Sequence, residues 1–250
     1  MLAALVGISL LFPQLIDSTK TLKEPVPASA ELTHDKRGDI FVARKMYREA
    51  VDSYRQALDA SPRQPRFYNK LGIAYHRLGM LGEAQRSYEE AAKLDSQYAE
   101  AVNNLGTVYF AERRYKKAQR TYEKALKIDP QSASVYSNLG TALFARRRYE
   151  QATEAYMKAL ELDPAVFETG SRGGTMLQDR TVEERAKYYY HLAQAFAENG
   201  QYDRSLMYLR RSIEEGYGKA KKADQDPAFE AMYEMPEFLA VVHPETAALR

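Results

Sequence analysis

The sequence predicts an all-α fold built from stacked helix pairs, and two observations lead to this prediction. Residues 103–130 read NNLGTVYFAERRYKKAQRTYEKALKIDP, and residues 137–164 read SNLGTALFARRRYEQATEAYMKALELDP, nearly the same text 34 residues later. Within each copy the apolar residues recur at spacings of three and four, which marks one buried face of a helix. Such a repeat is typical of an array of helical units, each of which buries its apolar face against its neighbour.

The 34-residue period extends over four units, residues 31–164. Small residues form three of its columns, and tyrosine forms a fourth. The columns are Gly38, Gly72, Gly106 and Gly140; Ala50, Ala84, Ala118 and Ala152; Ala57, Ala91, Ala125 and Ala159; and Tyr54, Tyr88, Tyr122 and Tyr156. Gly106 and Ala118 indicate a close approach of the two helices of a unit, and we expect Tyr109 and Tyr122 to fill the space between units.

Each unit is predicted to contain two helices. In the third unit the first helix carries its apolar face at Val102, Leu105 and Val108, and a polar turn follows at residues 112–114. The second helix is expected to stop at Asp129-Pro130, because proline lacks a backbone donor and biases the residue before it away from the helix.

These columns resemble the tetratricopeptide repeat. Leu-Gly, an aromatic residue, Tyr-x-x-Ala, then Tyr-x-x-Ala-Leu and Asp-Pro follow one another in the order typical of that family, and the resemblance covers residues 31–164. It implies a right-handed α-solenoid of antiparallel helix pairs, in which the first helices line a concave groove. It also implies a binding scaffold rather than an enzyme.

The chain after the fourth unit is predicted to hold an insertion, a divergent fifth unit and a cap. Residues 165–185 contain a glycine-rich loop and the start of the next helix, and the loop either spaces the fifth unit or folds into the groove. The fifth unit covers residues 186–218, where Ser205 and Ser212 replace two of the alanines. Residues 219–250 are expected to form a helical cap, because the last unit of a solenoid has no neighbour to cover it.

Residues 1–16, MLAALVGISLLFPQLI, form a strongly apolar segment. The segment falls short of the roughly 20 apolar residues that span a bilayer, and it resembles the core of a secretory signal. Residues 17–30 have the composition of a linker. We therefore expect export, or membrane association through this segment; the alternative is an apolar helix packed on the open end of the fold of a cytoplasmic protein.

Composition gives no sign of catalysis. Lys and Arg number 36 against 34 Asp and Glu, and the formal net charge of +2 is too small to indicate a nucleic-acid or membrane partner. The chain has no cysteine, and its four histidines are scattered without ligand spacing. No enzyme, cofactor or metal site is therefore expected, and the oligomeric state is left open.

The resemblance places one face of each first helix in the groove, where we expect a protein or peptide to bind. The predicted groove residues are Arg66, Asn69, His76, Arg77, Glu100, Asn103, Asn104, Thr107, Phe110, Ser137, Asn138, Thr141 and Phe144, and the insertion leads on to Lys187 and Tyr190. Asn104 and Asn138 share a column, and a carboxamide can pair with both polar groups of a peptide backbone. The alternative is that the two asparagines only bond neighbouring helices.

Arginines gather in the turns between paired helices and are predicted to align as a basic ridge. The ridge consists of Arg113, Arg114, Arg146, Arg147 and Arg148. An adaptor that docks an anionic partner through this ridge, such as membrane headgroups, an acidic protein or nucleic acid, is the alternative function. Nucleic acid is disfavoured, because these turns lack interleaved aromatic rings on which bases stack.

Overall fold

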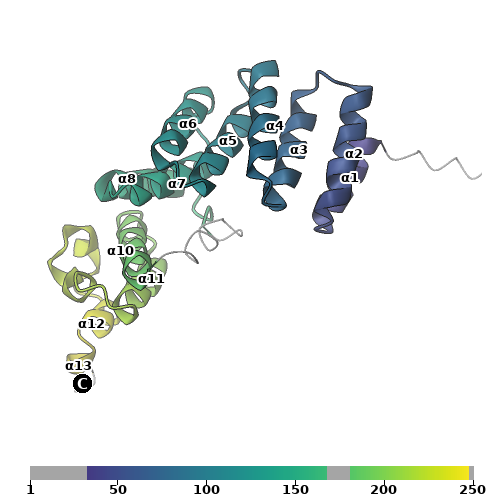
Figure 1. The fold of residues 1–250 in the computed structure, drawn as a ribbon. Helices are drawn as coiled ribbons and strands as arrows, with labels where there is room; N and C mark the ends of the chain where they lie inside the picture. Colours follow the sequence, from purple (N-terminus) through teal and green to yellow (C-terminus); the bar gives the residue numbers. More distant parts are fainter. Residues whose placement is uncertain (1–32, 168–180, 248–250) are drawn as a thin grey trace, which may run out of the picture. The chain divides into compact units, whose positions relative to one another are not determined.

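The computed structural model describes residues 33–167 and 181–247, and all regular structure within these ranges is helical (Figure 1). Each of the first four units forms a helix pair, as the sequence predicts. The helices are α1 (His34–Ala43), α2 (Tyr47–Ala60), α3 (Pro65–Arg77), α4 (Leu81–Leu94), α5 (Ala99–Ala111), α6 (Tyr115–Ile128), α7 (Ala133–Ala145) and α8 (Tyr149–Leu162).

The fifth unit and the cap follow. The fifth unit consists of α10 (Val182–Glu198) and α11 (Tyr202–Glu214). The cap consists of η1 (Ala220–Gln225), η2 (Pro227–Met232), α12 (Pro236–Val242) and α13 (Pro244–Ala247). The apolar segment 1–16, the linker 17–30 and the glycine-rich part of the insertion at 168–180 lie outside the described residues.

The close approach within a unit is made by a tyrosine that lies on a glycine. A Cβ atom added to Gly106 of α5 would lie 2.5 Å from Cε1 of Tyr122 on α6, and the other three units repeat this contact. Tyr122 is fully buried. Its ring therefore lies between the two helices of its own unit, and it also shares a buried cluster with Val135 and Ala142 of the next unit.

The fifth unit has different side chains at the positions of the glycine–tyrosine contact. Ala193 stands in the glycine column and Leu209 in the tyrosine column, so a larger residue on one helix is matched by a smaller one on the other. Ser205 Oγ donates a hydrogen bond to the carbonyl oxygen of Ala193 at 2.9 Å, and Ser212 Oγ donates to that of Ala186 at 2.7 Å. The buried serines thus add direct bonds from α11 to α10.

The turn inside each unit requires one residue in the left-handed region. This residue is Lys45, Gly79, Arg113, Arg147 and Gly200 in the five units, with φ between 60° and 77°. Glycine adopts this conformation freely, whereas an L side chain clashes with the following carbonyl oxygen. Two units meet the requirement with glycine, and three place a strained cation there.

The cap buries an apolar cluster against the fifth unit. Phe229, Met232 and Phe238 are fully buried and pack in one cluster with Leu209. Asp226 fixes the entry of the cap, since Tyr190 of α10 donates to its carboxylate and the backbone N–H of Ala228 also bonds to it. The cap predicted for the end of the solenoid is confirmed.

Among residues 33–167 and 181–247, no helix combines the length and the apolar character that crossing a membrane requires.

Candidate functional site

The candidate site is the polar face of the first helices α3, α5 and α7, and its predicted residues differ widely in exposure. Arg66, Arg77 and Glu100 are exposed, while His76, Phe110, Ser137 and Asn138 are partly exposed. The remaining six predicted groove residues are buried: Asn69, Asn103, Asn104, Thr107, Thr141 and Phe144.

The asparagines of this face form hydrogen bonds between successive units. Asn104 Nδ2 donates to Asn69 Oδ1 at 2.9 Å, and Asn138 Nδ2 donates to Asn103 Oδ1 at the same distance. Both bonds join residues 35 positions apart, so one pair of columns supplies both contacts. We call these contacts the inter-unit pairs. In them asparagines bond asparagines of the neighbouring unit, as in the alternative stated above for Asn104 and Asn138.

The first interface carries a charged version of the same pair. Lys70 Nζ lies 3.8 Å from Asp35 Oδ2, again 35 residues apart, and 2.6 Å from Asp39 Oδ2. Arg66 also contacts Asp35, at 2.9 Å, and Tyr54 donates to Asp39 at 2.7 Å. A set of ion pairs therefore occupies the place that carboxamides take in the next two interfaces.

The buried pair Asn69–Asn104 is covered by side chains that precede and begin α5. Asn69 Nδ2 donates to the hydroxyl oxygen of Tyr98 at 3.1 Å and to Glu100 Oε1 at 3.0 Å. Asn69 is 1% exposed and Asn104 is 4% exposed. Both carboxamides are thus bonded inside the structure, whereas Asn138 reaches the surface.

Each of the two predicted groove phenylalanines packs on the tyrosine five residues after it, but the two differ in exposure. Phe110 packs on Tyr115 with ring centroids 5.0 Å apart, and Phe144 packs on Tyr149 at 5.2 Å. Phe144 also meets the edge of the Tyr188 ring and is only 3% exposed, because α10 packs against it. Phe110 therefore offers part of its ring to the surface, and Phe144 belongs to the core.

Where α10 continues this face, His191 occupies the column of Asn138. Its ring stacks on Tyr149 with centroids 5.0 Å apart, and its Nδ1 lies 2.7 Å from Gln194 Oε1. Burial lowers the pKa of His191 to about 4; the bond to Gln194 acts in the opposite direction, and the nearby lysines Lys219 and Lys187 lower the pKa further. The imidazole is therefore neutral at physiological pH.

The other two residues named for this stretch differ from each other. Lys187 Nζ lies over the rings of Tyr149 and Tyr217, at 5.0 and 5.8 Å from their centroids. Tyr190 is buried, and its hydroxyl is committed to Asp226 of the cap. Lys187 is thus the more accessible of the two.

The basic ridge meets a hollow in the surface of about 910 Å³, which we call the cationic hollow. It lies between the α5–α6 turn, one face of α6 and the end of α7. Its lining residues are Arg113, Arg114, Tyr115, Lys116, Lys117, Arg120, Thr121, Lys124, Ala145 and Arg146. Arg147 and Arg148 of the ridge lie outside it. Arg120 and Lys124 were not among the residues predicted from the sequence, although they follow Lys116 at helical spacing.

Three of these cations are held by neighbouring side chains, and one of them, Arg146, donates a hydrogen bond to the side chain of Gln119. Arg114 pairs with Glu112 at 2.8 Å, and both Arg114 and Lys117 lie over the ring of Tyr109, at 4.8 and 4.0 Å. Burial, followed by a hydrogen bond to Glu89, raises the pKa of Tyr109 to about 12. The phenol is therefore neutral at physiological pH and adds no negative charge beside Arg114 and Lys117.

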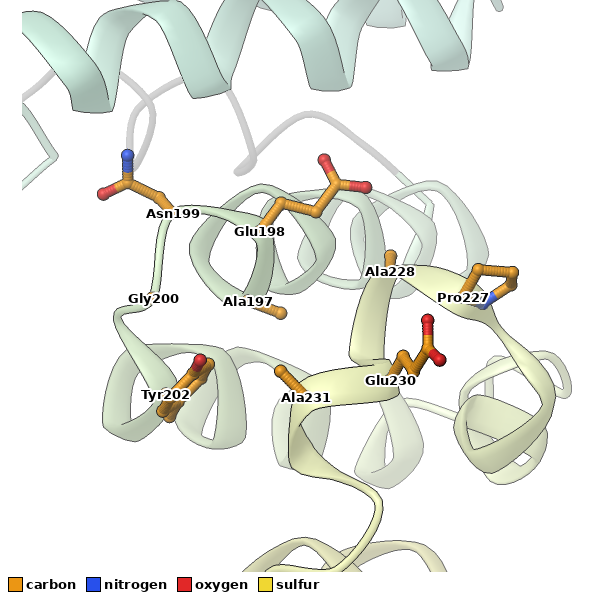
Figure 2. Close-up of a pocket in the computed structure, with 9 residues that line it drawn as sticks. All are labelled: Ala197, Glu198, Asn199, Gly200, Tyr202, Pro227, Ala228, Glu230 and Ala231. Carbon is orange, nitrogen blue, oxygen red and sulfur yellow. The ribbon is translucent and has the colours of Figure 1, made fainter.

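A second hollow of about 620 Å³ lies in the last unit, between the end of α10, the start of α11 and η2 (Figure 2). Ala197, Ala228 and Ala231 supply methyl groups, while Glu198 and Glu230 supply carboxylates. Burial and the nearby charge of Asp226 raise the pKa of Glu198. This hollow contains none of the residues predicted from the sequence.

In the part of the chain that the structure describes, no group of three or more His, Asp or Glu side chains is arranged to hold a metal ion. Among curated proteins, no sequence matches this chain.

Solved structures share the fold. The PilF structure from Pseudomonas aeruginosa is 19% identical with a TM-score of 0.55, and the alignment covers 87% of this chain and 96% of that one. MamA from Desulfovibrio magneticus RS-1 is 21% identical with a TM-score of 0.51, with 77% and 95% covered. At these identities the likeness concerns the fold alone.

Sequence models of one repeat family match most of the described chain. A TPR repeat model matches residues 38–79, and tetratricopeptide repeat models match residues 67–131, 97–165 and 186–215. The last match coincides with the divergent fifth unit that contains Ser205 and Ser212. With its stacked helix pairs and repeated glycine–tyrosine contacts, the chain belongs to the tetratricopeptide repeat family.

Proposed function

We propose that this protein is a non-enzymatic scaffold that holds a protein or peptide segment along its first helices and so helps to assemble a larger complex. Membership of the tetratricopeptide repeat family supports a protein-interaction role. The observation that carries the proposal is the polar face of α3, α5 and α7, where the inter-unit pairs set polar side chains at the same place in successive units.

The partly exposed asparagine of this face is suited to a peptide backbone. Asn138 uses one N–H in its bond to Asn103, and a carboxamide has a second N–H and an oxygen with two lone pairs. Packed helices lie about 8–10 Å apart, and an extended peptide advances roughly 3.3 Å per residue. A peptide laid across the face would therefore meet a new unit at about every third residue.

The buried asparagines have a different role in this proposal. The Asn69–Asn104 bond fixes the register of α3 against α5, and Asn69 also bonds Glu100 at the surface. The partner would then contact Glu100, Phe110, Ser137 and Asn138, which are at least partly exposed. Thr107, Thr141 and Phe144 would support this surface from below.

A pair of arginine substitutions tests the groove. Ser137 is partly exposed on α7, and Gln151 is exposed on α8 of the same unit. We expect Ser137→Arg to abolish recovery of the partners that the wild-type chain captures in its native host, because the long side chain obstructs the face. Gln151→Arg adds the same charge elsewhere and is expected to keep them. Retention of every partner by the Ser137→Arg chain contradicts the proposal.

The composition of residues 1–16 supports a further proposal, that the chain is exported or anchored to a membrane. The test is fractionation of the tagged full-length chain together with sequencing of its N-terminus. Recovery of the whole chain from the cytoplasm with residue 1 intact contradicts it.

A further inference from the structure

We propose that the cationic hollow is a second docking site, which binds an acidic segment of a polypeptide. Its lining includes seven Lys or Arg side chains and no Asp or Glu. Arg113, Lys116, Arg120 and Lys124 are exposed, and they follow one another at helical spacing from the α5–α6 turn along α6. The site lies on the α5–α6 turn, α6 and the end of α7, and none of the predicted groove residues lines it, so the failure of either proposal leaves the other intact.

The backbone of the turn that carries Arg113 accepts glycine as well as a basic residue, which supplies a conservative substitution for the test. Arg113 has φ of 60° and Arg147 has φ of 62°, while the second and fifth units place Gly79 and Gly200 at this position. Glycine is thus compatible with the turn, and it is the residue that avoids the clash of the left-handed conformation. Lys45 and Arg147 have the same conformation and lie outside the hollow, so this strain is a property of the turn and does not by itself mark the hollow.

The shape and chemistry of the hollow favour an acidic polypeptide over other anions. A membrane-binding surface combines basic residues with exposed apolar anchors, and none of the exposed large apolar residues of the described chain lines this hollow. Binding of single-stranded nucleic acid uses exposed rings on which bases stack, whereas the one ring here, Tyr115, is packed on Phe110. A volume of about 910 Å³ suits a short segment whose carboxylates meet several cations at once.

The repeat supplies a matched control for the test. Lys45 and Arg48 are exposed in the first unit and stand in the columns of Arg113 and Lys116, and Lys45 has the same strained turn conformation with φ of 61°. The hollow variant is Arg113→Gly with Lys116→Gln, and the control variant is Lys45→Gly with Arg48→Gln. Both remove two positive charges and relieve the same backbone strain, but only the first alters the hollow.

The probe is a fluorescent unstructured peptide of alternating glutamate and serine, titrated with the full-length chain and followed by anisotropy. We expect binding that weakens as salt is added, that falls roughly three- to tenfold in the hollow variant and that changes by less than about twofold in the control. The melting temperature of the hollow variant is expected not to fall, because glycine suits the turn.

Three outcomes overturn the proposal. Equal losses of affinity in the two variants show that the peptide responds only to the net charge of the chain. Equal affinity for a peptide with glutamine in place of glutamate shows that the site does not require an acidic partner. The third outcome is that single-stranded RNA or phosphatidylserine vesicles bind more tightly than the acidic peptide and that the hollow variant loses this binding. The site then binds another class of anion. Ser137→Arg is expected to bind the acidic peptide normally, which separates this site from the first-helix face.

Discussion

Asn104 donates a hydrogen bond to Asn69 one unit earlier, and Asn138 donates the same bond to Asn103. The two donors share a column and differ in burial, since Asn104 is 4% exposed and Asn138 is partly exposed. Removing a buried partner leaves a polar group without compensation, whereas water replaces a lost bond at the surface. One column thus provides both a structural and an accessible asparagine.

Replacing Asn104 by alanine is expected to lower the free energy of unfolding by about 1–3 kcal/mol, because the buried Oδ1 of Asn69 loses its donor. The matched change Asn138→Ala is expected to cost less, about 0.5–1.5 kcal/mol, because Asn138 is partly exposed and water can enter its place to bond the Oδ1 of Asn103. Urea unfolding of the two variants and the wild-type chain measures the difference. Equal losses would show that burial does not distinguish the two bonds.

The contact between Gly106 and Tyr122 is open to a double-mutant cycle. Gly106→Ala places a methyl group 2.5 Å from the tyrosine ring and is expected to cost about 1–3 kcal/mol. The fifth unit has Ala193 and Leu209 at these positions, so Gly106→Ala combined with Tyr122→Leu should cost less than the sum of the single changes. Additive losses in thermal or urea unfolding would argue against direct coupling.

The buried serines of α11 are expected to stabilise the fifth unit modestly. Ser212→Ala removes the bond to the Ala186 carbonyl and should cost about 0.5–1.5 kcal/mol, since alanine fits this column in the other units. Ser96→Ala, at an exposed position, serves as the control and should change stability by less than about 0.5 kcal/mol. Hydrogen exchange of α10 and α11 locates the effect, and unchanged protection in Ser212→Ala would contradict it.

His191 predicts a pH dependence of stability with a definite sign. Its folded pKa of about 4 lies below the ordinary value of 6.5, so between these values the unfolded chain binds a proton that the folded chain does not. The contribution of His191 is present in full above pH 6.5 and is lost as the pH falls toward 4. Over this range it amounts to roughly 1–3 kcal/mol.

The measurement compares unfolding free energies of the wild-type chain and His191→Gln across this pH range. Because carboxylates titrate in both proteins, the difference between the two curves isolates the histidine. The wild-type curve should fall more steeply on acidification. Parallel curves would mean that the ring is protonated in the folded chain as readily as in the unfolded one.

Much of the fold follows from residues that the sequence shows directly. The glycine and alanine columns predict helix pairs in close contact, and Gly106 lies in that contact against the ring of Tyr122, a partner that the sequence did not identify. The sequence also shows that Ser205 and Ser212 interrupt the alanine columns, but their partners are backbone carbonyls, which leave no mark in the pattern of side chains. The hydrogen bonds of these serines therefore could not be predicted from the sequence.

The candidate site was less accessible to prediction, because exposure depends on neighbours in other units. Phe110 and Phe144 share a column, yet α10 packs over Phe144 and leaves Phe110 partly exposed. Asn104 and Asn138 differ for a similar reason, since Tyr98 and Glu100 both bond Asn69, the partner of Asn104. A repeat pattern assigns both members of a column to one face and does not distinguish them.

The exchange of carboxamides for charges at the first interface predicts an effect of salt on the order in which the units unfold. Neighbouring units supply most of the stability of a repeat array, so its ends open before its middle. At the N-terminal end, Lys70, Asp35 and Asp39 are held by ion pairs that added salt weakens, whereas the neutral bond between Asn69 and Asn104 is insensitive to screening. Raising the ionic strength should therefore fray α1 and α2 selectively, while the units that carry the first-helix face and the cationic hollow stay folded.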